Sequence, residues 1–148
     1  MRYFFIVIVA LIVAGCTKNK FTTKPQLKIK SINSTDISGP QTLVIVLSLT
    51  DKQGDYSTFF AVKKTVASCP SSNFTDSTLF LLPQSFIDTK KTEGEITVTL
   101  DQIHRGANTC LAPGGGVKAD TAIFSFWTRD RAGNLSDTVS TKPIIIRN

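Results

Sequence analysis

Histidine and cysteine are scarce in this sequence, which contains one histidine and three cysteines among 148 residues. A zinc site draws several Cys and His ligands from short spacings, and neither His104 nor the widely separated cysteines provide such a pattern. A Ser-His-Asp hydrolase would have to recruit His104, and no Gly-X-Ser-X-Gly turn accompanies it. Glu93 and Glu95 would point the same way along a strand, whereas a glycosidase needs carboxylates on opposite sides of a sugar bond. We therefore expect no enzymatic activity and no cofactor.

Long apolar runs are also missing, apart from the stretch from Tyr3 to Ala14 that follows Met1 and Arg2. This run is too short for a comfortable transmembrane helix, which needs roughly 20 apolar residues. One positive charge, a short apolar core and small residues at its end are the pattern of a secretory signal peptide. An ordinary signal peptide that happens to be followed by Cys16 is one interpretation of this pattern.

The stretch VAGC, which ends at Cys16, resembles the lipobox of bacterial lipoproteins, in which small residues precede the cysteine. The resemblance implies cleavage between Gly15 and Cys16, a diacylglyceryl thioether on Cys16 and a further acyl chain on its amino group. Several acyl chains hold a protein firmly on a membrane, since each buried methylene adds about 0.8 kcal/mol. The expected organisation is a lipoprotein signal peptide over residues 1–15, a lipidated tether over 16–24 and one domain over 25–148.

Two cysteines, Cys69 and Cys110, remain once Cys16 is assigned to the lipid. In an exported chain such an even pair is most simply a disulfide. Closing a loop of about 40 residues would stabilise the fold by roughly 4 kcal/mol on the loop-entropy model. The alternatives are two free buried thiols, or one nucleophile that would need His104 as its base.

Acidic residues are outnumbered, with 17 Lys and Arg against 11 Asp and Glu and a net charge of +6. The basic residues are spread along the chain, whereas a nucleic-acid site gathers them on one face with aromatic residues among them. We expect no nucleic-acid partner, and a solvated surface that faces acidic glycans or anionic lipid headgroups.

Helical periodicity is absent, and short segments of β-branched and alternating apolar residues take its place. In the segment 95–101, Ile96, Val98 and Leu100 would face inward, while 42–50 is apolar enough for a central strand. The expected strands are 25–32, 42–50, 56–66, a short one within 69–94, 95–101, 121–128 and 135–147. About seven short strands separated by turns predict an all-β, immunoglobulin-like antiparallel β-sandwich.

The stretches LVIVLSLTDKQGD, GEITVTL and FSFWTRDRAGNLSDTVST, in this order, resemble immunoglobulin-like or fibronectin-III-like domains in small lipoproteins of Bacteroidota. The resemblance implies a sandwich anchored to the outer membrane by its lipid. Acidic residues directly after Cys16 would resemble the surface-export signal of that group, and CTKNK lacks them, which favours the periplasmic face over the cell surface. We expect a non-catalytic binding or accessory module with an envelope protein or a glycan as partner. A carbohydrate-binding adhesin and a structural spacer are the alternatives.

Three aspartates, Asp51, Asp55 and Asp130, lie in glycine-containing turns that follow or precede expected strands. Turn carboxylates that meet at one end of a sandwich could bind Ca²⁺, which takes six to eight oxygen ligands. The stretch DKQGD is not an EF-hand loop, and capping of the turns by the aspartate side chains explains the same residues without a metal. We favour turn capping over a metal site.

Modification and ligand contacts are two further expectations. The triplets that contain Ser77, Thr121 and Thr138 resemble the Asp-Ser/Thr-apolar signal for O-glycosylation in Bacteroidota, and they also arise by chance in a Ser/Thr-rich chain. Exposed aromatic side chains would offer stacking faces to a sugar, and the candidates are Tyr56, Phe74 and Trp127. For Trp127 we favour core packing against the disulfide, as in many sandwiches.

Overall fold

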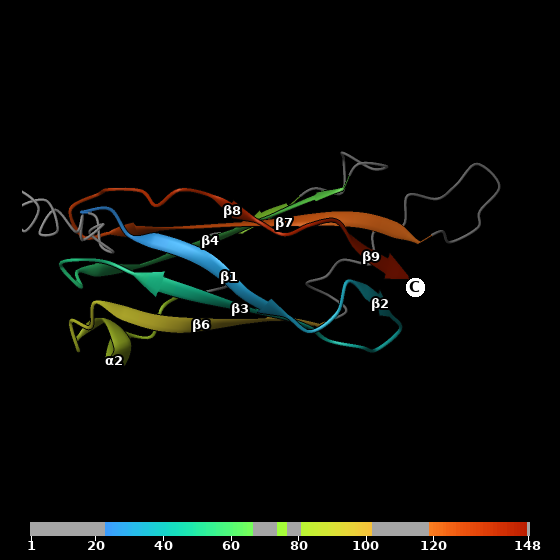
Figure 1. Cartoon of the computed structure of the whole chain (residues 1–148), viewed down its shortest axis with the longest axis horizontal. Coiled ribbons are helices and arrows are strands. Elements are labelled where there is room, and N and C mark those ends of the chain that lie inside the picture. The colour runs from blue at the N-terminus through green and yellow to red at the C-terminus, as the bar shows by residue number, and fades with distance from the viewer. Residues whose placement is uncertain (1–22, 67–73, 77–80, 102–118, 148) are drawn as a thin grey trace, which may run out of the picture.

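The chain forms a β-sandwich in the computed structural model, which describes residues 23–66, 74–76, 81–101 and 119–147 (Figure 1). These residues contain nine strands and one short helix. In chain order they are β1 (Gln26–Ile32), β2 (Asp36–Ser38), β3 (Leu43–Thr50), β4 (Tyr56–Val66), β5 (Phe74–Asp76), α2 (Gln84–Ile87), β6 (Glu93–Leu100), β7 (Asp120–Asp130), β8 (Val139–Ser140) and β9 (Ile144–Arg147). Within this part of the chain no helix is long and apolar enough to cross a membrane.

The strands form two sheets, one in the order β1-β3-β6 and the other in the order β2-β9-β7-β4-β5 with β8 paired to β7. This division places β1, β3 and β6 opposite the antiparallel pair β4–β7, which is the arrangement of an immunoglobulin-like sandwich. The predicted all-β sandwich is confirmed. The described strands outnumber the expected seven because β2, with three residues, is too short to show a period and because the strand expected over 135–147 is divided into β8 and β9.

Strand β3 is the centre of the smaller sheet, as its apolar sequence predicts. Its residues alternate strictly between buried and half-buried, and it pairs with β1 on one side and β6 on the other. Strand β1 forms the edge of the sheet, where a bulge between Ile29 and Ser31 shifts the register. Because one face of β3 is fully buried, a slip of one residue would expose its whole apolar set, so the register is strongly determined.

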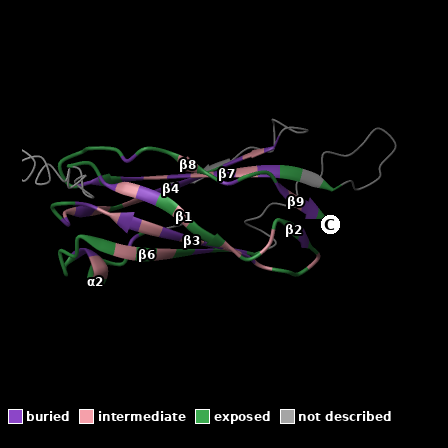
Figure 2. Cartoon of the chain, viewed as in Figure 1, coloured by how far each residue is buried: buried purple, intermediate pink, exposed green. Residues whose placement is uncertain are grey.

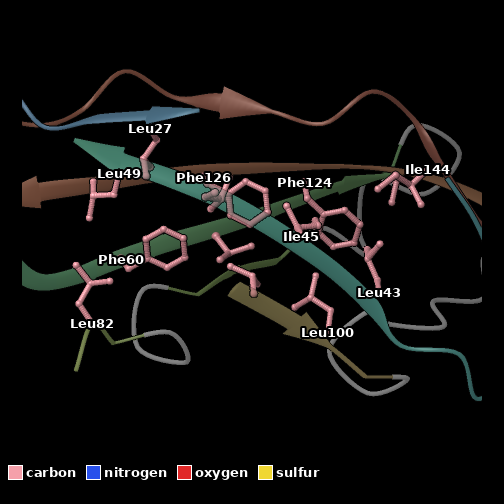
Figure 3. Packing of buried hydrophobic residues seen from close by; sticks show 14 of the residues in the cluster. Leu27, Leu43, Ile45, Leu49, Phe60, Leu82, Leu100, Phe124, Phe126 and Ile144 are labelled. Carbon is pink, nitrogen blue, oxygen red and sulfur yellow. The ribbon is translucent and has the colours of Figure 1, made fainter. Parts of the chain in front are cut away.

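The core lies between the two sheets and is built from alternate residues of β3, β4, β6 and β7 (Figures 2 and 3). Figure 3 shows Phe60 and Phe126 pointing into the same space as Ile45 and Leu100 of the opposite sheet. The Phe60 and Phe126 rings are stacked with their centroids 6.1 Å apart and their planes 20° apart. Full burial of an aromatic or branched side chain contributes about 1.5–3 kcal/mol, so this layer supplies most of the driving force for folding.

The chain crosses from one sheet to the other between β1 and β2. The Asn33 side chain donates to the carbonyl of Thr42 and accepts from the amide of Val44, both at 2.8 Å, which ends the β1–β3 pairing. Strand β2 then pairs with β9 in parallel, in contrast to the expected antiparallel sandwich. The Arg147 guanidinium donates two hydrogen bonds of 2.8 Å to the Asp36 carboxylate and closes this junction.

The last segment differs from the single strand expected over residues 135–147. It runs along β7 as an isolated bridge at Leu135, then β8, then β9. Proline has no backbone N–H for a ladder, so Pro143 interrupts the pairing just before β9. The predicted turn at the end of β7 is present, with Gly133 at φ 91°.

Helix α2 covers one end of the core beside the start of β6. Its Phe86 ring stacks on Tyr56 with centroids 5.4 Å apart. A Cβ atom at Gly94 would lie 2.5 Å from the Phe86 ring, so glycine is needed for this close contact. The helix therefore holds the beginning of β6 against the turns described next.

Candidate functional site

Three aspartates from separate segments meet at one end of the sandwich. Asp51 directly follows β3, Asp55 directly precedes β4, and Asp130 ends β7. The β4–β7 register pairs Tyr56 with Asp130, which brings the two segments side by side. One carboxylate oxygen from each aspartate lies within 4.8 Å of the others. The structure thus places together the three residues that the sequence singled out.

Backbone contacts hold these segments in place. The Asp51 amide donates to the Thr92 carbonyl at 2.8 Å, and the Tyr56 hydroxyl donates to the same carbonyl at 3.0 Å. The Arg131 amide donates to the Asp55 carbonyl at 2.8 Å. The β3–β4 turn is therefore fastened to both the start of β6 and the end of β7.

Gly54 permits the tight approach of the β3–β4 turn to the segment before β6. Its φ is +63°, a conformation that side chains rarely adopt. A Cβ atom at this position would lie 2.4 Å from the carbonyl oxygen of Lys90. Only glycine satisfies both conditions, so the position of Asp51 and Asp55 depends on it.

Turn capping is present at two of the aspartates. Asp51 accepts a hydrogen bond of 2.7 Å from the Gln53 amide through Oδ1. Asp130 accepts from the Asn134 amide through Oδ1 and from the Asn134 side chain through Oδ2, both at 2.7 Å. Capping leaves two atoms unexplained, because Asp51 Oδ2 and Asp55 Oδ1 are buried without any hydrogen-bond partner.

The electrostatic environment of the cluster is unfavourable to three negative charges. Asp51 and Asp130 are only 1% and 2% exposed, and Asp55 is half-buried. Burial raises the pKa of the Asp51 carboxyl, the backbone amides of Gln53 and Gly54 partly offset this rise, and the charges of Asp55 and Asp130 add to it. No Lys or Arg among the described residues forms an ion pair with the three carboxylates.

Trp127 lies on the outer face of the larger sheet, so the prediction that it packs in the core is wrong. Along β7, Phe124 and Phe126 are buried, which turns Trp127 outward, where it is half-buried. It lines a shallow hollow of about 430 Å³ whose other walls are polar or aliphatic. The lining residues are Lys63, Thr65, Ser125, Trp127, Leu135, Ser136 and Thr138.

Tyr56 is fully buried, so the hypothesis that it offers a stacking face to a sugar is wrong. Its hydroxyl donates a hydrogen bond to the Thr92 carbonyl, and its ring stacks on that of Phe86. The Phe74 side chain lies outside the described residues. On the same outer face as Trp127, the Arg129 guanidinium lies 4.9 Å from the centre of the Phe59 ring.

A second hollow, of about 350 Å³, lies between α2 and β6. Leu81, which is 61% exposed, forms part of its wall together with Phe86 and Ile96. Glu95 also lines it and forms an ion pair with Lys30 of β1, so the carboxylate is engaged on the sheet surface.

The remaining sequence candidates divide between exposed positions and positions outside the described residues. Thr121 and Thr138 are exposed, which gives a sugar access to both. Cys16, Cys69, Cys110, Ser77 and His104 lie outside the part of the chain that the structure describes.

No protein-family model and no curated protein matches this sequence. A similar solved structure is the CARDB domain of a Pyrococcus furiosus protein, described as a complex with di-metal ions. The two share 11% sequence identity at a TM-score of 0.35, and the match covers 85% of this chain and 96% of that one. A likeness of this size transfers neither the metal ions nor the function of that protein to this chain.

Proposed function

We propose that this protein is a lipid-anchored, non-catalytic module of a bacterial cell envelope. The observation that carries the proposal is the stretch LIVAGC, which ends at Cys16 shortly before the first strand begins at Gln26. A signal-peptide core, a cysteine at the cleavage point and a folded domain behind a short polar tether are the parts of a lipoprotein. We expect the anchor to lie in the outer membrane and the domain on its periplasmic face, because CTKNK lacks acidic residues directly after Cys16.

A disulfide between Cys69 and Cys110 is part of this proposal. Cys69 lies three residues after Val66, the last residue of β4, and Cys110 lies in the connection between β6 and β7. Val66 pairs with Ala122 near the start of β7, so both connections join the larger sheet at the same end. This arrangement supports a bond that would tie the two connections together in an oxidising compartment.

The role of the module is to bind a partner, and the outer face of β4 and β7 is the proposed surface. Trp127 lines a hollow there together with Lys63, Thr65 and Ser125, and the Ser125 hydroxyl shares a hydrogen bond of 2.8 Å with that of Ser140. The second candidate function, carbohydrate binding, is favoured by this same combination, because sugars stack on aromatic rings and hydrogen-bond to hydroxyls.

The anchor is tested by metabolic labelling with a radioactive fatty acid followed by fractionation of the envelope. We expect the wild-type protein to carry label and to sediment with membranes. Cys16→Ser should lose both properties, whereas the neighbouring conservative change Thr17→Ser should keep both. Label on Cys16→Ser would refute the lipoprotein assignment.

The partner is tested by crosslinking the anchored protein in its own envelope, with mass spectrometry, and by a glycan array. Trp127→Ala is compared with Ile123→Ala, which removes another half-buried side chain from the outward face of the same strand. A saturable glycan signal lost only with Trp127→Ala would establish a sugar-binding module. A reproducible protein partner with no glycan signal would establish an accessory subunit. If the soluble Cys16→Ser form captured the same partner as the wild-type protein, the lipid anchor would be dispensable for binding.

A further inference from the structure

We propose that Asp51, Asp55 and Asp130 form a binding site for one Ca²⁺ ion at the end of the sandwich where β1 begins. This site is independent of the lipid anchor and of the outer face of β4 and β7. Its place in the fold follows from pairing, since Gln26 at the start of β1 lies opposite Thr50, the residue before Asp51.

The spacing of the oxygens fits a calcium ion. One oxygen from each of the three carboxylates lies within 4.8 Å of the others. Two oxygens on opposite sides of one Ca²⁺ are about 4.6–5.2 Å apart, because each Ca–O distance is about 2.3–2.6 Å. The three separations are therefore within the span that one Ca²⁺ ion can bridge.

The unpartnered oxygens point to a ligand. Asp51 is 1% exposed, and its Oδ2 atom has neither a hydrogen-bond donor nor water-accessible surface. Asp55 Oδ1 is in the same condition. A buried carboxylate oxygen without a partner is costly, and proteins place such groups against a cation or a donor. Turn capping by Asp51 engages only Oδ1 and gives no reason for Oδ2 to be buried beside two more carboxylates.

The donor set is made of hard oxygens alone, with no nitrogen or sulfur, which favours Ca²⁺ over zinc or copper. Each carboxylate oxygen has two lone pairs, so the hydrogen bonds that Asn134 gives to Asp130 leave room for a cation. Asp55 is half-buried, so water can reach its side of the cluster and complete the six to eight ligands that calcium takes.

Binding would join segments that are distant in the sequence. Asp51 and Asp55 belong to the β3–β4 turn, and Asp130 to the end of β7 in the other sheet. The Thr92 carbonyl, just before β6, accepts hydrogen bonds from the Asp51 amide and the Tyr56 hydroxyl. These bonds connect the site to the start of β6 as well. A bound ion would therefore fasten this end of the two sheets together.

The test is calorimetric titration of the full chain, purified in detergent and stripped with a chelator, with calcium chloride. We expect one ion per chain, with an affinity in the range of extracellular calcium modules, a Kd of about 10⁻⁴–10⁻³ M. Asp55→Asn should weaken binding at least about tenfold, because it removes one charged ligand. This variant should fold normally, since the Asp55 carboxylate accepts no hydrogen bond from any described residue.

The matched control is Asp137→Asn, which removes the same charge from an exposed position outside the cluster. It should leave calcium binding unchanged. Terbium luminescence provides a second readout, because Tb³⁺ takes the same oxygen ligands and Tyr56 lies beside the site to sensitise it. Absence of saturable binding up to about 10 mM calcium, with a folded domain by circular dichroism, would overturn the proposal. Equal losses in Asp55→Asn and Asp137→Asn would overturn it as well, since they would show a general charge effect.

Discussion

The replacement Asp55→Asn should change the stability of the domain in opposite directions with and without calcium. In wild-type protein stripped of calcium, the Asp55 charge lies within 4.8 Å of the carboxylates of Asp51 and Asp130. Removing that charge removes two repulsions and breaks no hydrogen bond to a described residue. The variant should therefore be more stable than wild type in the presence of a chelator.

The size of the effect follows from the separation of the charges. Two unit charges 4.8 Å apart repel by about 0.9 kcal/mol in water and by about 3.5 kcal/mol at an effective dielectric constant of 20. Burial, and then the charges of Asp55 and Asp130, raise the pKa of Asp51, which agrees with repulsion inside the cluster. We expect Asp55→Asn to gain about 1–3 kcal/mol in chelator, which is roughly 4–12 °C in Tm for a domain of this size.

Calcium should reverse the order. At a calcium concentration of about one hundred times Kd, linkage stabilises wild type by about 2.7 kcal/mol, whereas the variant with weakened affinity gains far less. The assay is thermal unfolding by circular dichroism in chelator and over a calcium series, with Asp137→Asn as the control that should follow wild type throughout. Destabilisation of Asp55→Asn by more than about 1 kcal/mol in chelator would refute the reasoning, because the charge would then support the fold without a metal.

Two other predictions concern the turns and the sheet junction. Gly54→Ala should destabilise the fold by about 2–4 kcal/mol in urea unfolding, because the residue has a positive φ and its new Cβ atom would lie 2.4 Å from the Lys90 carbonyl oxygen. The control Gly133→Ala has a positive φ but open space around it, so it should cost only about 1 kcal/mol. Equal losses of stability in the two variants would contradict the clash at Gly54. The Arg147 hydrogen bonds hold the pKa of Asp36 in the folded protein below its value in the unfolded chain. The pair therefore stabilises the fold at pH values above the unfolded pKa of Asp36, and this stabilisation is lost as the pH falls through the folded pKa. NMR titration of Arg147→Gln should show the pKa of Asp36 returning to the ordinary range, and an unchanged pKa would contradict the pairing.

The main strands could be predicted because their burial follows the alternation of the sequence. Strand β3 was predicted to be a central strand from its continuous apolar run, and Val98 and Leu100 of β6 face inward as the alternation of that segment predicts. Strand β2 escaped prediction because its three residues are too few to show a period, whereas β5 lies within the range 69–94 where a short strand was expected and β8 lies within the strand expected over 135–147. They exist as strands because neighbouring strands supply their hydrogen-bond partners.

Trp127 shows the limit of analogy with other sandwiches. A period of two divides the residues of β7 into two faces, one with Phe124 and Phe126 and one with Ile123 and Trp127. The second face also carries the polar residues Thr121, Ser125 and Arg129, which indicates that it faces outward; the expectation that Trp127 packs in the core came instead from the analogy with other sandwiches. In the folded molecule the phenylalanines face the core, where Phe126 stacks on Phe60 of the neighbouring strand.

By itself the sequence determined an all-β chain, because β-branched and alternating segments without a helical period can bury their apolar faces only as packed sheets. It also pointed to the turn aspartates, since glycine and aspartate mark the ends of strands. Only the tertiary structure decided that Asp51, Asp55 and Asp130 meet, because their proximity depends on the register of β4 against β7 and on the close approach of the turn at Gly54. The burial of Asp51 Oδ2 and Asp55 Oδ1 without a hydrogen-bond partner, on which the proposed cation site rests, is likewise a property of the packed molecule and has no counterpart in the linear pattern.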